Sequence, residues 1–357
     1  MLQVELKRVA AQIDALLRED SFPAALRPDF LREAVRSYPC RGGKRLRPAL
    51  LLWCCGLLGG VPAKAIHAAA AVEIYHNWTL VHDDIIDDDN TRRGKPSSHA
   101  ELRQMALEKF GLQNPAAEKF GRNFAILAGD VQQGWAVDML LRAADDGVSP
   151  SLILALSRRL QELVNRELIS GEALDVEFSY RKINSLSVKD VSEMLSMKTG
   201  ALLKFCAETG AAIALNSPDF NDARIAGLGH FASTAGVAFQ MRDDWLGIFG
   251  EPEKFGKPIC SDLSESKPTL LLLDALRSLP EKQREQLMGL VGKQAFSSTD
   301  IESARSLIRD SGADSRILKE AAVLADDARK ILHSYPDDGV YQPLLLELLD
   351  YLVGRAE

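Results

Sequence analysis

The side chains best suited to chemistry are five aspartates within residues 83–89: Asp83, Asp84, Asp87, Asp88 and Asp89. Asp83 and Asp87 are four residues apart, so a helix would present both carboxylates on one face. Like charges at this spacing destabilise an isolated helix by roughly a few tenths of a kcal/mol, so we expect a cation to compensate them. A solvated acidic helix end is the alternative interpretation. The apolar neighbours Val81 and Ile85 argue against that alternative.

A second aspartate pair, Asp243 and Asp244, ends an apolar stretch that we predict to be a helix beginning near Phe220. Magnesium is usually held by one or two carboxylates together with substrate phosphates and waters. Two sparse acidic sets that face a shared cavity would therefore suit a diphosphate bridged by Mg²⁺. A calcium-binding EF-hand loop is excluded, because its D-x-D-x-D-G spacing and terminal Glu are missing.

Basic residues cluster beside glycine or proline. The clusters are GGKRLRP at 42–48, RRGK at 92–95, KTG at 198–200, and the single residues Lys257 and Lys267. Guanidinium and ammonium groups beside flexible backbone are suited to gripping phosphate oxygens. Any one of these lysines could be a plain surface residue. The first two clusters flank the first acidic motif, however, and this placement favours a phosphate site.

The overall composition limits the class of protein. The formal net charge of −7 argues against nucleic-acid binding, because proteins that bind phosphate backbones present a basic surface. Five cysteines without a CxxC pair fit neither a disulfide framework nor a zinc site, so we expect a reducing cytoplasmic environment. The first 20 residues carry charges throughout, unlike a signal peptide. The apolar run 48–58 is too short to span a bilayer, so we expect no stable membrane insertion.

Apolar residues recur at helical spacing along nearly the whole chain, and no stretch alternates convincingly as a strand would. We therefore predict an all-α protein, organised as a single domain over residues 1–357. Helix starts are predicted at Ser149 before Pro150, at Ser187 with Asp190, and at Thr299 with Glu302.

Seven motifs in a fixed order identify a family resemblance between about Arg41 and Leu270. They are GGKRLRP, HNWTLVHDDIIDDDNTRRGKP, the AGD that ends at Asp130, the GEALD that ends at Asp175, KTG, FQMRDD and GKPICSDLSESKPTL. In these motifs the chain resembles the polyprenyl synthetase, or trans-isoprenyl diphosphate synthase, family.

The resemblance implies a large helical bundle with a central cavity, assembled as a homodimer. It implies an enzyme that condenses isopentenyl diphosphate with an allylic diphosphate, which could be the dimethylallyl, geranyl or farnesyl compound. It also implies Mg²⁺ as cofactor, with three ions per active site when the allylic diphosphate is bound.

The family pattern assigns roles to individual residues. The metal ligands would be Asp83, Asp84, Asp87, Asp243 and Asp244. The allylic diphosphate would be gripped by Arg92, Lys198 and Lys257, with Lys267 also in the substrate-binding set. The diphosphate of isopentenyl diphosphate would contact Gly43, Lys44, Arg47, His76 and Arg93. Thr199 and Gln240 would lie beside the reacting carbons.

Two positions depart from the family pattern. Gly247 stands where many members carry a third aspartate in the second motif, and Glu172 stands where glutamine is common. We expect Gly247 to lower the affinity for metal first, because it removes one possible ligand. We interpret the second as a tolerable polar exchange.

Three other functions fit the sequence less well than a prenyltransferase does. A class I terpene cyclase needs one diphosphate site, which would leave GGKRLRP and RRG without a purpose. A non-catalytic partner subunit would be expected to lose its acidic motifs, and the first is whole. A purely structural helical protein explains none of the clusters of basic residues and glycine.

Product length is predicted from Trp78, five residues before Asp83 and hence about 7.5 Å further down the same helix. Helical periodicity alone would nominate Thr79; the family resemblance is what places Trp78 in the wall of the elongation pocket. A large indole there would stop the growing chain early. We therefore predict geranylgeranyl diphosphate as the product, with farnesyl diphosphate as the alternative. Trp78 could also be an ordinary core residue.

Overall fold

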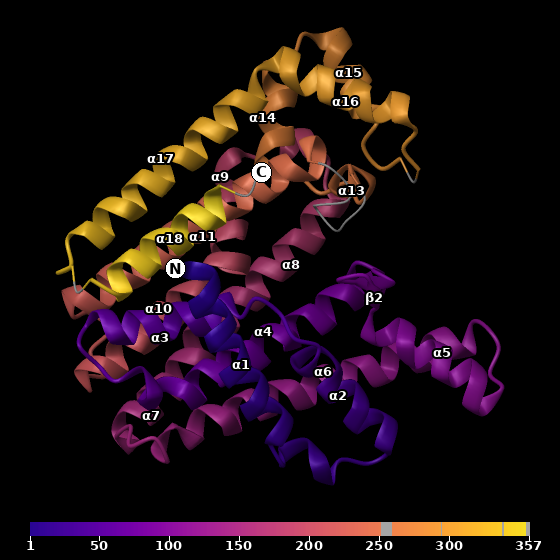
Figure 1. Ribbon diagram of the computed structural model, residues 1–357. Helices are drawn as coiled ribbons and strands as arrows, with labels where there is room; N and C mark the ends of the chain where they lie inside the picture. The colour runs from indigo at the N-terminus through magenta and orange to yellow at the C-terminus, as the bar shows by residue number, and fades with distance from the viewer. Residues whose placement is uncertain (251–258, 294, 338, 355–357) are drawn as a thin grey trace. The chain divides into compact units, whose positions relative to one another are not determined.

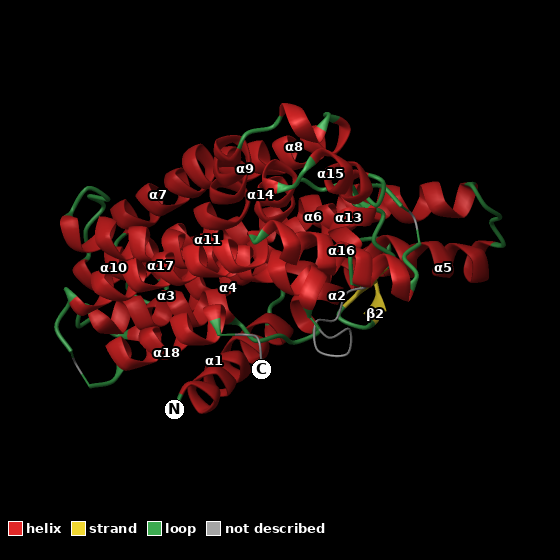
Figure 2. Ribbon diagram, turned by 90° about the horizontal axis from the view of Figure 1, so that it is seen from above, coloured by secondary structure: helices red, strands yellow, loops and turns green. Residues whose placement is uncertain are grey.

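The computed structural model describes residues 1–250, 259–293, 295–337 and 339–354. The ordered elements are almost entirely helical, which confirms the all-α prediction (Figure 2). Helix α1 (Leu2–Glu19) illustrates the cause, since its buried residues recur at positions 2, 6, 9, 13 and 17 and so form one apolar face. The described strands form one small hairpin, in which β1 (Thr91–Arg92) pairs antiparallel with β2 (Lys95–Pro96).

The chain divides into two compact units, and each is built from two separate stretches of sequence. Unit 1 comprises residues 1–159 and 206–225, and unit 2 comprises residues 160–205 and 226–357. Two of the boundaries fall inside helices α10 (Ala201–Leu215) and α11 (Ala223–Phe249). The organisation of the chain as one domain stays a prediction.

Unit 1 contains α1, η1 (Phe22–Ala25), α2 (Asp29–Cys40), α3 (Leu46–Leu57), η2 (Pro62–Ala65), α4 (Ile66–Ile86), the β1–β2 hairpin, α5 (Ser98–Phe110), α6 (Ala116–Leu141), η3 (Arg142–Ala144), α7 (Pro150–Arg159) and most of α10. Helix α4 packs along α6 and also contacts α1, α2 and α3. It is therefore covered on several sides, and its residues 68–75 are all buried. This central helix carries the first aspartate motif at its C-terminal end.

Unit 2 contains η4 (Leu160–Asn165), α8 (Arg166–Tyr180), η5 (Ile183–Ser185), α9 (Val188–Leu195), η6 (Ser196–Gly200), most of α11, α13 (Ser261–Ser264), α14 (Leu270–Ser278), α15 (Glu281–Met288), α16 (Ser298–Ser311), α17 (Ala313–His333) and α18 (Tyr341–Val353). Helix α14 contributes four consecutive buried leucines, at positions 270–273, to its core. Helices α17 and α18 run side by side (Figure 1).

The helix boundaries confirm some sequence predictions and correct others. Helix α7 begins at Pro150, and Ser187 and Asp190 form a reciprocal capping box at the start of α9. The capping box of α16 is formed by Ser297 and Asp300, so the prediction of Thr299 with Glu302 was two residues late.

Helix α11 also corrects a prediction, because Asp243 and Asp244 do not end it. The helix continues to Phe249, where Trp245 and Phe249 stack with their ring centroids 5.1 Å apart. Ile248 is buried in the core of unit 2, so the apolar pattern that drives the helix extends beyond the aspartate pair.

No helix within the described ranges combines the length and the apolar character that crossing a membrane requires.

Two helical glycines of unit 1 allow a test of the packing. A Cβ at Gly210 in α10 would lie 2.1 Å from the carbonyl oxygen of Leu51, whereas a Cβ at Gly134 in α6 would meet nothing within 4 Å. Gly210→Ala should therefore destabilise the protein by about 1–3 kcal/mol. Gly134→Ala, the matched control, should stabilise it by about 0.5–1 kcal/mol, because alanine is the better helix former. Urea unfolding measures both, and equal effects would contradict the close contact of α10 with α3.

Candidate active site

The first aspartate motif lies at the C-terminal end of α4. Asp83 and Asp84 belong to its last turn, and Asp87 is its C-cap residue. The Asp87 amide donates to the Asp83 carbonyl at 2.8 Å, so the helical turn extends to Asp87 and the two residues lie one turn apart, as predicted. Asp83 and Asp87 are part-exposed, whereas Asp84 is fully buried. Of the three predicted ligands in this motif, Asp83 and Asp87 therefore present partly accessible carboxylates and Asp84 does not.

The buried Asp84 carboxylate is bound by two side chains. The Tyr38 hydroxyl donates to its Oδ2, and Arg92 donates to its Oδ1 through Nε at 2.7 Å and also through Nη2. Arg92 Nη2 further reaches Asp83 Oδ2 at 3.2 Å. Burial raises the pKa of Asp84, while Arg92 and Tyr38 act in the opposite direction. Burial would likewise lower the pKa of Arg92, but Asp84, Asp83 and Asp89 raise it. The Arg92 guanidinium is thus bound directly to the carboxylates of Asp83 and Asp84.

The glycine loop before α3 meets the β1–β2 hairpin. Gly42 and Gly43 both have positive φ, 81° and 155°. Arg93 Nη1 donates to the Gly42 carbonyl at 3.1 Å, and a Cβ built on Gly43 would lie 3.0 Å from the same nitrogen. Glycine at position 43 therefore leaves room for Arg93. Lys44, next in the loop, is exposed.

Arg45, for which the sequence predicted no role, is the most deeply buried charge of this loop. It donates to Asp14 Oδ1 from Nε at 2.9 Å and from Nη2 at 2.6 Å, and to Glu73 Oε1 from Nη1 at 2.6 Å. Its backbone is left-handed, with φ 49°, at the N-cap of α3. Asn77 donates to the Glu73 carbonyl at 2.7 Å. The signal that could have revealed this network is Glu73, a carboxylate within the apolar part of α4.

Arg47 and His76 form a basic group beside this network. Arg47 Nε is buried and has no hydrogen-bond partner among the residues that the structure describes. Burial lowers the pKa of Arg47. Burial, followed by the charges of Arg47, Arg93, Arg92 and Arg45, lowers the pKa of His76 well below its usual value. An excess of positive charge with a donor left unpaired is the arrangement that an anionic ligand would complete.

Trp78, on the same helix, is 6% exposed. Its ring packs edge-on against Tyr75 at 4.8 Å and against His82 at 5.9 Å between centroids. The side chain is therefore well held inside unit 1.

In unit 2, the KTG motif occupies a π-helical turn, η6, which follows α9 directly. Lys198 Nζ donates to Asp175 Oδ2 at 2.7 Å and lies 2.8 Å from Glu172 Oε2, so the departure at Glu172 supplies an ion-pair partner. A Cβ on Gly171 would lie 2.4 Å from the Lys198 backbone nitrogen, which explains the glycine in GEALD. Thr199 is half-buried in the same turn.

Asp244 of the second aspartate pair lines a small cavity in unit 2. Gln240 donates to Asp244 Oδ1 at 2.9 Å, while Oδ2 of Asp244 is buried without a hydrogen-bond partner among the described residues. Asp244, Asp262 and Lys267 line a cavity of about 10 Å³, with room for one water molecule. Burial, and then Asp262, raise the pKa of Asp244 well above its usual value, while Gln240 lowers it. Lys267 pairs with Glu265 at 2.8 Å.

The carboxylates of the two aspartate motifs are of the kind that magnesium binds. Within the described part of the chain, no three His, Cys, Asp or Glu side chains are arranged to hold a metal by themselves. Magnesium commonly takes one or two carboxylates and completes its shell with substrate oxygens and water. The orphaned, buried Oδ2 of Asp244 is an oxygen that a cation would satisfy.

The predicted residues are thus distributed over both units. Unit 1 holds the first aspartate motif and His76 on α4, Arg92 and Arg93 on the β1–β2 hairpin that follows it, and Arg47 on α3. Unit 2 holds Lys198, Thr199, Gln240, Asp243, Asp244 and Lys267. Lys257 lies outside the described residues. A cavity shared by the two acidic sets stays a prediction.

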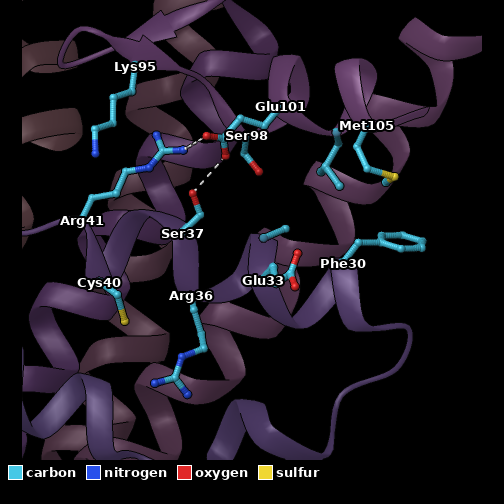
Figure 3. Close-up of a pocket in the computed structure, with 12 residues that line it drawn as sticks. Phe30, Glu33, Arg36, Ser37, Cys40, Arg41, Lys95, Ser98, Glu101 and Met105 are labelled. Carbon is cyan, nitrogen blue, oxygen red and sulfur yellow. Dashed lines mark hydrogen bonds and ion pairs between the residues drawn. The ribbon is translucent and has the colours of Figure 1, made fainter. Parts of the chain in front are cut away.

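A larger cavity of about 570 Å³ lies between α2 and α5 of unit 1 (Figure 3). Its walls include Ser37 and Arg41 from α2 and the turn after it, Lys95 from β2, and Ser98 and Glu101 from α5. None of the predicted site residues is among the described residues that line it. Glu101 pairs with Arg41 and accepts from the Ser37 hydroxyl at 3.3 Å.

Comparison with known proteins identifies the family. The polyprenyl synthetase profile matches residues 28–308. The chain is 34% identical to a geranylfarnesyl diphosphate synthase of Aeropyrum pernix, over 93% of this chain and 96% of that protein. It is 35% identical to a farnesyl diphosphate synthase of Geobacillus stearothermophilus, over 71% and 78% respectively.

A solved structure supports the same assignment. The geranylgeranyl pyrophosphate synthase of Corynebacterium glutamicum, complexed with isoprenyl diphosphate and magnesium, superposes with a TM-score of 0.86 at 28% identity, covering 99% of both chains. The order of motifs, the helical fold and these likenesses agree, and the chain belongs to the polyprenyl synthetase family.

Proposed function

We propose that this prenyltransferase condenses isopentenyl diphosphate with an allylic diphosphate to form geranylgeranyl diphosphate. The observation that supports the proposal is that cationic side chains gather at two places along α4. Asp83 and Arg92 stand at its end, while His76, about 10.5 Å earlier along the axis, stands with Arg47 and Arg93. Two such places suit an enzyme with two diphosphate substrates, whereas a terpene cyclase needs one.

Each substrate has its own basic set in this proposal. Arg92, Lys198 and Lys257 grip the allylic diphosphate, and Lys267 adds a further charge. Gly43, Lys44, Arg47, His76 and Arg93 bind isopentenyl diphosphate. The unpaired Arg47 Nε supports the second assignment, because a diphosphate oxygen would give it a partner.

Asp83, Asp84, Asp87, Asp243 and Asp244 are proposed to hold Mg²⁺, with three ions per active site. Magnesium, when bound, supplies positive charge that stabilises the departing diphosphate. Asp84 also contacts Tyr38 and Arg92 in the interior, so we propose that it positions Arg92 as well.

The chain's own residues then promote ionisation. As the allylic carbon–oxygen bond breaks, negative charge grows on the leaving diphosphate and the cationic side chains around it stabilise that charge. The electron pair of the isopentenyl double bond forms the new carbon–carbon bond to the allylic cation. A proton then leaves the new cation for the released diphosphate, which restores an allylic product. Thr199 and Gln240 lie beside the reacting carbons.

Lys198 must exchange partners in this scheme. Asp175 and Glu172 hold its ammonium group at 2.7 and 2.8 Å. An incoming diphosphate shares or replaces these partners, so the pair keeps the lysine oriented between turnovers.

Chain length is assigned to Trp78. Trp78 lies five residues before Asp83, about 7.5 Å along the helix from the aspartates. Its burial and its contact with Tyr75 support a rigid wall at that depth. The names of two related proteins bracket the proposed product length. A farnesyl product is one isoprene unit shorter than a geranylgeranyl product, and a geranylfarnesyl product is one unit longer.

A homodimer is part of the same proposal. Ile126 and Leu127 on α6 are 44% and 47% exposed, large apolar side chains that a second copy could cover. Sedimentation equilibrium distinguishes a dimer from a monomer.

Incubation with isopentenyl diphosphate and each allylic primer, followed by product chromatography, tests the function. Geranylgeranyl diphosphate should form with Mg²⁺, disappear in excess chelator, and return when Mg²⁺ is restored. Asp83→Asn should reduce the rate strongly and leave the thermal unfolding curve cooperative. Full turnover in chelator would refute the metal assignment, and a normal rate in Asp83→Asn would mean that other carboxylates act.

Replacing Trp78 by alanine tests the chain-length assignment. Removing the indole should open the elongation pocket and shift the product to longer prenyl chains, at a stability cost of about 3–5 kcal/mol. Trp53→Ala is the matched control, because Trp53 is fully buried in α3 of the same unit. It should cost similar stability without changing the product. A folded Trp78→Ala enzyme that makes the parent product would show that Trp78 is only a core residue.

The lowered pKa of His76 predicts a pH dependence of stability. The unfolded chain takes up this proton near pH 6.5, whereas the folded protein resists it. The contribution is therefore fully present above about pH 6.5 and is lost as pH falls below it, with a slope of up to about 1.4 kcal/mol per pH unit. His76→Gln should remove that slope between pH 7.5 and 5.5 in urea unfolding. His333→Gln, at an exposed position, should keep it; equal slopes in all three proteins would contradict the prediction.

A further inference from the structure

We propose that the Tyr38 hydroxyl is a positioning group for the reaction: it fixes the Asp84 carboxylate and, through Asp84, the Arg92 guanidinium at the allylic diphosphate. This inference rests on the proposed function. Tyr38 belongs to α2, precedes GGKRLRP in the sequence and touches no reacting atom in the scheme above.

The hydroxyl of Tyr38 uses both of its hydrogen-bonding capacities. It donates to Asp84 Oδ2 and accepts from the Ser98 backbone amide at 3.1 Å. Tyr38 is 3% exposed and Asp84 0%. Because both side chains are buried, water has little access to replace the phenol. The direction of the Tyr38 hydroxyl is therefore set by Asp84 on one side and by α5 on the other.

Each oxygen of the Asp84 carboxylate then has its own partner. Oδ2 accepts from Tyr38, and Oδ1 accepts from Arg92 Nε at 2.7 Å. A carboxylate held at both oxygens cannot rotate freely about its last bond. Arg92, tied through Nε, keeps Nη2 within 3.2 Å of Asp83 Oδ2, which is where the metal-bound diphosphate is proposed to sit.

The ring of Tyr38 is held as firmly as its hydroxyl. The Arg41 guanidinium lies over it, 5.0 Å from the ring centroid. Arg41 in turn donates to the Pro96 carbonyl at 2.9 Å and pairs with Glu101. Figure 3 marks the ion pair between Arg41 and Glu101. The hairpin that carries Arg92 and the helix that supplies the Ser98 amide are thereby fixed to the same phenol.

The consequence concerns catalysis rather than folding alone. Stabilisation of a leaving group depends on charges that are already oriented when the bond breaks. Without the hydroxyl, the buried Asp84 carboxylate loses one donor and its hold on Arg92 loosens. The rate of ionisation should therefore fall, while binding of isopentenyl diphosphate at Arg47 and His76 should not change.

Tyr38→Phe is the test, because phenylalanine keeps the ring beneath Arg41. With saturating allylic primer, kcat should fall about 10- to 100-fold, as expected for one hydrogen bond to a charged group. The KM for isopentenyl diphosphate and the Mg²⁺ requirement should stay at parent values. The matched control is Ser37→Ala, which removes the hydrogen bond from the neighbouring α2 residue to Glu101 of α5 and should leave kcat unchanged.

A double-mutant cycle separates positioning from mere structural support. If Tyr38 acts through Arg92, Tyr38→Phe should add almost nothing to the loss caused by Arg92→Ala. Full additivity, a parent-level kcat in a folded Tyr38→Phe enzyme, or a rise in the KM for isopentenyl diphosphate equal to the fall in kcat would each overturn the proposal. A parent enzyme inactive with every primer would instead refute the proposed function.

Discussion

The central helix of unit 1 carries two buried carboxylates, and the rest of the site depends on how they are neutralised. An isolated charge inside a protein costs several kcal/mol, so it must be paired and hydrogen-bonded. Glu73 of α4 is bound by Arg45, and Asp84, three turns later, is bound by Arg92. Each arginine comes from one of the two basic motifs that flank the helix in sequence. The same ion pairs therefore neutralise α4 and fix the loops that bear the proposed substrate-binding groups.

The need to neutralise carboxylates also explains what the cationic side chains of the site contact when no substrate is bound. Arg92 lies on Asp83 and Asp84, and Lys198 lies on Asp175 and Glu172. In the proposed function, substrate and magnesium would enter as an exchange of partners: the cations would bind the diphosphate, and the carboxylates would bind the metal ions. Such an exchange keeps buried charge compensated throughout, which costs less than uncovering it.

Local sequence patterns predicted the helices and the motif residues, because spacing within one helix is a local property. The 3.6-residue period placed Asp83 and Asp87 one turn apart, and the Ser187 capping box was read correctly. Tyr38 could not be found this way, since its partner Asp84 is 46 residues away. The continuation of α11 to Phe249 was missed for a similar reason: packing of Ile248 in the core outweighs the polar break at the aspartates.

The backbone at Gly247, in the second acidic motif, is joined to a second segment of unit 2. The Gly247 carbonyl accepts from the Cys260 amide at 2.8 Å, so the backbone of α11 is tied at this position to the start of α13. That short helix carries Asp262, the neighbouring charge that most raises the pKa of Asp244. Position 247 carries no carboxylate, but the cavity that Asp244 lines also includes Asp262. Asp244 and Asp262 therefore place two carboxylates from separate segments at one cavity, an arrangement that would favour a cation.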